Sequence, residues 1–208
     1  MMGFLRSTLM AVLALSVVAC GEEKAALPSM EQAVEYQIVD KRDTTRTEGG
    51  ETRTARAVYI YAPVTDVVSR VYTALKAAVR VQGEDGVQFV EAFLLAAPYK
   101  ALAGTGKFVA KARYALDGKD DSPLRLKLTE GIWDARYSEF VITELEAKIT
   151  KLWFENRKRF SKPANYGLTQ VDLPLMQAFV AKELKIDPKD VKMTQWQNYK
   201  YFPEDWEK

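Results

Sequence analysis

Thiol and imidazole groups are almost absent from this chain, which limits what can hold its fold together. Its 208 residues include one cysteine, Cys20, and no histidine. A single thiol can form no disulfide within the chain, and the usual ligands of structural zinc are missing. The chain therefore has to bury an apolar core, and we expect it to fold without a metal, a cofactor or a disulfide.

The composition is that of an ordinary globular protein. Hydrophobic residues make up 48% of the sequence and charged residues 28%, with 30 basic residues against 28 acidic ones. Balanced charge of this kind creates no strong field for a polyanion. We therefore expect no nucleic-acid partner.

The first 21 residues carry the most specific signal in the sequence. A basic residue, Arg6, precedes the uncharged and largely apolar run 7–19. This run is shorter than the roughly 20 apolar residues that a membrane-spanning helix needs, and it is typical of a secretory signal. It leads into residues 17–21 (VVACG), which resemble the lipobox of bacterial lipoproteins.

The resemblance to the lipobox implies a cellular location. Residues 1–19 would be removed as a signal peptide, and lipid on Cys20 would hold the protein to a membrane of the bacterial cell envelope. An Asp after the cysteine resembles an inner-membrane retention signal, and this chain has Gly21 there. The resemblance thus implies the outer membrane, facing the periplasm, if the cell has two membranes. The alternative is an ordinary signal peptide with an incidental cysteine.

Beyond the signal, residues 20–33 are predicted to form a short tether and residues 34–208 a single globular domain. Apolar residues that alternate or run on predict strands, and those that recur every three or four positions predict helices. The predicted strands are 34–39, 53–61, 87–95, 107–116, 124–128 and a last one within 191–202. The predicted helices are 66–82, capped by Thr65, 138–160 and 173–185, with Leu152 and Phe179 in the stripes of the last two.

These elements follow the order β-β-α-β-β-β-α-α-β, and most of the links between them have the length of hairpins. The order predicts an α+β fold, with a largely antiparallel sheet and about three helices packed on one face. Residues 34–118 also resemble an uncharacterised small α+β domain family of bacterial envelope proteins, on the stretches 35–40, 56–61 and 106–118. The resemblance implies a small sheet with one helix packed across it, and it transfers no functional residue.

The sequence lacks the residues of the common catalytic centres. Without histidine there is no Ser-His-Asp triad, and without a free cysteine there is no thiol nucleophile. Residues 104–107 (GTGK) look like the end of a phosphate loop, but Ala101 and Phe108 stand where the full motif has Gly and Ser or Thr. We therefore favour a turn that leads into a strand. The aspartates of 117–121 could gather a hard cation, but their spacing favours a hairpin turn.

One segment suggests hydrolytic chemistry. Glu130 and Asp134 flank Trp133, and a glycan-cleaving site can use two carboxylates beside an aromatic platform. The simpler interpretation is a loop between a strand and a helix, with Trp133 packed on the core.

A basic face is the remaining candidate site. Alternation within 107–116 places cations on one side of the strand, and pairing with 124–128 would add two more. Anionic lipid headgroups or an anionic envelope polymer could bind there, whereas the alternative is a solvated face that discourages aggregation. The cations concerned are Lys107, Lys111, Arg113, Arg125 and Lys127.

Together these observations predict a lipid-anchored, non-enzymatic protein of the cell envelope. Its expected partners are the membrane, through Cys20, and another envelope protein or an anionic envelope component. Two alternatives stay open: a hydrolase acting on glycan or peptide through Glu130 and Asp134, and a purely structural spacer.

Overall fold

A computed structural model of the chain describes residues 26–48, 50–121, 126–139, 142–163, 169–192 and 199–202. The predicted signal peptide, Cys20 and Arg125 lie outside these residues. In the described part of the chain, no helix is both long enough and apolar enough to cross a bilayer.

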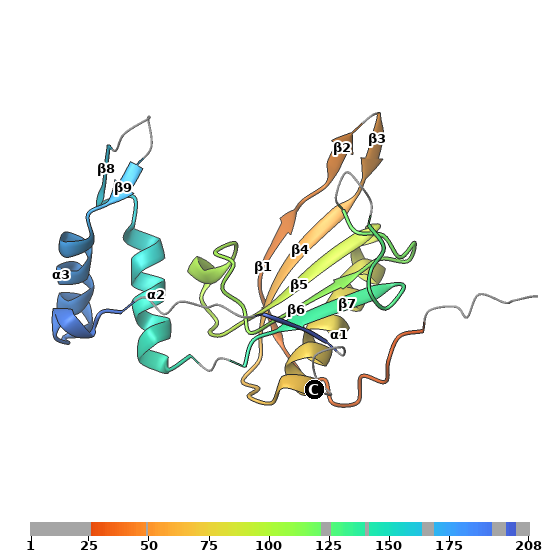
Figure 1. Ribbon diagram of the computed structural model, residues 1–208, viewed down its shortest axis with the longest axis horizontal. Helices are drawn as coiled ribbons and strands as arrows, with labels where there is room; N and C mark the ends of the chain where they lie inside the picture. The colour runs from red at the N-terminus through yellow and green to blue at the C-terminus, as the bar shows by residue number, and fades with distance from the viewer. Residues whose placement is uncertain are drawn as a thin grey trace, which may run out of the picture.

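Six strands form the main sheet (Figure 1), in the spatial order β1-β4-β5-β6-β7-β10. Neighbouring strands run antiparallel except β4 and β5, which are parallel and are joined by helix α1 (Val67–Asp85). The α+β class and the largely antiparallel sheet are thereby confirmed. The strands are β1 (Gln37–Asp43), β4 (Ala55–Tyr61), β5 (Phe89–Leu95), β6 (Ala110–Tyr114), β7 (Trp133–Tyr137) and β10 (Lys200–Phe202).

Smaller elements decorate this sheet. Along the chain, β1 is connected to β4 by a separate hairpin of β2 (Arg46–Glu48) and β3 (Glu51–Arg53). Strand β8 (Ser161–Pro163) pairs with β9 (Thr169–Val171). Two further helices are α2 (Glu144–Asn156) and α3 (Leu173–Leu184). Short 3-10 turns are η1 (Lys100–Leu102) and η3 (Pro188–Asp190).

Helix α1 covers one face of the sheet and closes the main core. The Asp66 side chain accepts a hydrogen bond from the Ser69 N–H, so Asp66 caps the helix in place of the predicted Thr65. Gly86, with a φ of 64°, ends it in the left-handed conformation. The apolar stripe of α1 packs on side chains that alternate along the strands, such as Val58 and Ile60.

The start of the domain lies earlier than predicted. Leu27 and Met30 pack against the main core, and the Val34 N–H donates to the Thr73 hydroxyl of α1. Leu27 and Met30 were expected to belong to the tether 20–33. Their apolar side chains pack on the core instead, and this packing fixes the segment on the domain.

Of the helices in the described residues, only α1 lies across the sheet, which corrects the prediction of about three helices on one face. Helices α2 and α3 pack on each other around Ile149, Met176 and Val180, and they stand beside the sheet in Figure 1. Ala147 of α2 belongs to a second apolar cluster that includes Tyr59 and Leu102, and α2 contacts the η1 turn. The physical reason is that α2 and α3 cover each other's apolar stripes, so neither needs the face that α1 occupies.

The predicted strand 124–128 is not a strand in its described part. Lys127 and Leu128 make isolated bridges, and the Asp120 carboxylate accepts a hydrogen bond from the Leu126 N–H, which ties this segment into a loop. Strand β7 takes the place beside β6 instead, within residues that were expected to be a loop before a helix. Helix α2 accordingly begins late, at a capping box formed by Thr143 and Glu146.

Candidate functional site

The face of the sheet turned away from α1 carries an ordered set of side chains. Successive residues of a strand point to opposite faces, so the positions between the core residues project here. In one row, Glu91 of β5, Arg113 of β6 and Asp134 of β7 lie in register. The next row brings together aromatic and basic side chains, namely Tyr59, Phe93, Lys111, Arg136 and Tyr201.

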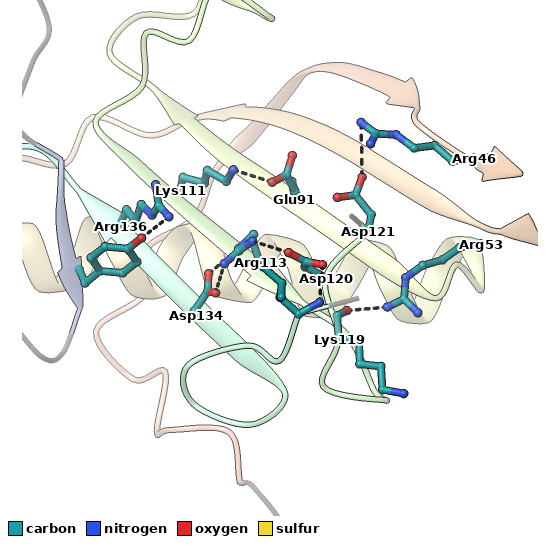
Figure 2. A network of polar contacts seen from close by, with 12 residues as sticks. Arg46, Arg53, Glu91, Lys111, Arg113, Lys119, Asp120, Asp121, Asp134 and Arg136 are labelled. Carbon is teal, nitrogen blue, oxygen red and sulfur yellow. Dashed lines mark hydrogen bonds and ion pairs between the residues drawn. The ribbon is translucent and has the colours of Figure 1, made fainter. Parts of the chain in front are cut away.

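The charged half of this face is a network of ion pairs (Figure 2). Arg113 Nε donates to Asp134 Oδ1 at 2.7 Å, Nη2 donates to Oδ2, and Nη1 lies 3.5 Å from Asp120 Oδ2. Asp134 and Asp120 are both buried. Burial acts most strongly and lowers the pKa of Arg113, but the hydrogen bond to Asp134 and the charges of nearby carboxylates together raise it. This arrangement suits a structural clamp between β6, β7 and the 117–121 loop.

The structure does not bring together the four predicted cations that it describes. Lys111 Nζ lies 2.5 Å from Glu91 Oε1, and Arg113 is paired as described, so both charges are compensated. Lys127 is exposed on the loop, and Arg125 lies outside the described residues. Lys107 precedes β6, where the alternation is broken because Val109 and Ala110 both enter the main core. Lys107 therefore belongs to a different part of the face.

The aspartates of 117–121 are likewise engaged with arginines. Asp117 accepts two hydrogen bonds from the buried Arg53, at 2.7 and 2.9 Å, and Asp121 lies 3.9 Å from Arg46. The hydrogen bond from Arg53 lowers the pKa of Asp117. Within the residues that the structure describes, no group of three acidic, cysteine or histidine side chains is arranged to hold a metal ion.

The aromatic half of the face surrounds a cavity of about 180 Å³. Tyr59 and Phe93 stack with ring centroids 5.0 Å apart, and Phe108 meets Phe93 edge-on at 5.5 Å. Tyr199 stacks on Phe108 at 4.2 Å, and its hydroxyl donates to the Gly106 carbonyl. The described lining residues are Tyr59, Phe93, Leu95, Leu102, Gly104, Gly106, Lys107 and Phe108.

One wall of the cavity is the GTGK segment 104–107. It forms the turn into a strand that the sequence favoured, with the Thr105 hydroxyl donating to the Leu102 carbonyl and accepting from the Lys107 N–H. Gly104 has a φ of 76°, and a Cβ there would lie 2.3 Å from Arg42 Nη1. The close approach of Arg42, which also donates to the Ala103 carbonyl, therefore depends on glycine.

The charges around the cavity are mostly basic. Arg42 lies over the Tyr59 ring and Lys111 over the Phe93 ring, each about 5 Å from the ring centroid (5.0 and 5.1 Å). Lys107 is half-buried, with its ammonium 5.9 Å from the Phe154 ring of α2, and burial lowers its pKa. Burial also raises the pKa of Tyr59.

Glu130, Trp133 and Asp134 do not converge on one site. Trp133 is buried in the main core on the α1 side, whereas Asp134 points to the other face and is held by Arg113. The Glu130 N–H donates to the Trp133 carbonyl in the turn before β7, and the Glu130 side chain is half-buried. The alternation of β7 thus separates the indole from the nearer carboxylate.

Comparison with known proteins supports an uncharacterised family. A family model described as a domain of unknown function, DUF4875, matches residues 31–196. The chain is also similar to a crystal structure of a DUF487 family protein from Desulfovibrio piger, with a TM-score of 0.57 and 23% identity over 85% of this chain and 99% of that one. At this identity the likeness shows a shared fold alone. No curated protein matches the chain.

Proposed function

We propose, since this chain belongs to the DUF4875 family of domains of unknown function, that it is a lipid-anchored, non-enzymatic binding module of the bacterial cell envelope. The observation that carries the binding part is the aromatic cavity on the face opposite α1. Sites for small molecules are concave and mostly apolar, with few polar groups, and this cavity has that character.

We favour a binding role over carboxylate catalysis, because the carboxylates described on this face are already paired with basic side chains. Both oxygens of Asp134 accept from Arg113, and Glu91 is paired with Lys111. A catalytic pair needs carboxylates that are free to exchange protons on either side of a bond. Neither Glu130 nor Asp134 lines the cavity.

The anchor is proposed from the lipobox-like segment 17–21. Replacing Cys20 by serine is expected to abolish incorporation of an alkyne-labelled palmitate into the protein, because the serine hydroxyl offers no thiol for the thioether to lipid. A Gly21→Ala control keeps the cysteine and should keep the label. Labelling is read by in-gel fluorescence after growth with the fatty acid, and a labelled Cys20→Ser protein would contradict the anchor.

Binding in the cavity can be tested with a neutral ring compound. We expect phenylacetamide to bind the full chain held in phosphatidylcholine nanodiscs, which avoid detergent in the cavity, as measured by saturation-transfer NMR against empty nanodiscs. Phe93→Leu should weaken this binding about two- to tenfold, because a ring–ring contact is lost.

Tyr72→Leu is the matched control for this experiment. It removes a half-buried aromatic ring of α1 that packs on Phe202, away from the cavity. Equal loss of binding in both variants, or no binding by the parent chain, would remove the cavity as the ligand site.

A further inference from the structure

We infer that the ligand of the aromatic cavity is a small ring compound with an anionic oxygen group, and that this group binds the Lys107 ammonium. The inference rests on the proposed function, because it assumes that the cavity holds a ligand. It adds the chemical class of that ligand and the residue that selects it.

The ring follows from the size and the walls of the cavity. An apolar cavity of about 150 Å³ holds benzene, and this one measures about 180 Å³. There is thus room for one six-membered ring and a short substituent. Tyr59, Phe93 and Phe108 contact one another as aromatic rings and line the cavity, so a ligand ring would meet aromatic walls there.

The anion follows from the position of Lys107. Among the described residues that line the cavity, Lys107 is the charged one, and the others are apolar, tyrosine or glycine. Its half-buried ammonium has lost part of its hydration, and burial lowers its pKa. An anion on a ligand in the cavity can accept a charge-assisted hydrogen bond from this ammonium, which has three donors.

Other side chains around the cavity also contribute positive charge. Arg42 and Lys111 stand over the rings of the cavity wall, and Lys100 lies on the η1 turn that precedes the GTGK segment. Among the described residues, the acids nearby are Asp40, which pairs with Arg42 and Lys100, and Glu91, which pairs with Lys111. The cations outnumber the carboxylates, so an anion is drawn toward the cavity and a cation is not.

Lysine also suits more than one anion. An ammonium is a compact charge with three rotatable donors, and it sets less strict geometry than the planar fork of arginine. Carboxylate and phosphate monoester are therefore both within the proposed class. Phenylacetate and phenyl phosphate distinguish them.

The experiment compares charged and neutral rings of nearly equal shape. Binding of phenylacetate and phenyl phosphate to the full chain in phosphatidylcholine nanodiscs is measured beside that of phenylacetamide. At least one anion is expected to bind about tenfold more tightly than the amide, as a hydrogen bond to a charged partner would give. Lys107→Met should remove that advantage, so that the anions bind no more tightly than the amide, and Lys107→Arg should restore it.

Lys100→Met is the matched control, because it removes a positive charge from the same loop at a residue that does not line the cavity. An equal loss of anion binding in Lys100→Met and Lys107→Met would overturn the assignment to Lys107. Equal binding of anions and amide would overturn the inference while leaving a ring-binding cavity. Failure of all three probes would overturn the proposed function as well.

Discussion

Replacing Arg113 by methionine is expected to lower the free energy of unfolding by about 3–5 kcal/mol, as the breaking of a buried ion pair does. Asp134 is 1% exposed, and both of its carboxylate oxygens accept from Arg113. Methionine has similar length but no donor, so the Asp134 charge would stay buried without its main partner. Urea unfolding followed by tryptophan fluorescence measures the loss.

A second substitution separates this mechanism from a mere loss of packing. Asp134→Leu in the Arg113→Met background removes the stranded charge, and the double variant is expected to recover most of the lost stability. Asp120 also keeps the hydrogen bond that it accepts from the Leu126 N–H. A double variant no more stable than Arg113→Met, or a single variant within about 1 kcal/mol of the parent, would contradict a buried structural pair.

Truncation of Leu75 to alanine is expected to cost about 2–5 kcal/mol, because this side chain fills the space between α1 and the sheet. Leu75 is fully buried, and its neighbours in the main core are equally closed to solvent. Thermal unfolding and urea unfolding should both report the loss. Leu175→Ala is the matched control, because Leu175 is 59% exposed on α3 and should change stability little.

The second apolar cluster provides a parallel measurement. Met176 of α3 is fully buried between α2 and α3, and Met176→Ala should fall in the same range of cost. The apolar stripes of the sequence had favoured Leu152 and Phe179 for this role, but both are only partly buried.

The Leu75 prediction has a clear contrary outcome. A cost for Leu75→Ala no greater than that for Leu175→Ala would mean that α1 does not close the core.

The parts of the fold that the sequence predicts well are those in which a pattern is local. The apolar residues of β4 and β5 and the helical period of α1 each reside in one short stretch, so each can be recognised without the rest of the fold. Asp172 likewise caps α3 as predicted, because a cap depends on residues three positions apart.

Strand β7 is missed because its signal is not local. Asp134 and Arg136 occupy alternate positions and make the segment resemble a loop, yet each is satisfied by a distant residue, Arg113 and Tyr201. The predicted basic face is affected in the same way, since Glu91 and Asp134 come from other strands and pair with Lys111 and Arg113. A single sequence does not show which charges will meet.

The cavity is also invisible in the sequence as a motif. Its wall is assembled from β4, β5 and the segment between η1 and β6, and these parts become neighbours only when the sheet forms. The GTGK segment was noticed for its likeness to a phosphate loop. In the structure, this segment is a turn with glycines at positive φ, and it places Lys107 at the edge of the aromatic cavity.

The pairing of β7 with β10 has a consequence for how such a chain can be built and altered. Tyr137, at the end of β7, lies directly opposite Lys200, at the start of β10. The chain thus leaves the sheet and returns to it at one point, with α2, α3 and the β8–β9 hairpin in between. This is the geometry of an inserted module, whose entry and exit are adjacent strands. Changes in the length of the module do not shift the register of the sheet, so the two parts can diverge at different rates.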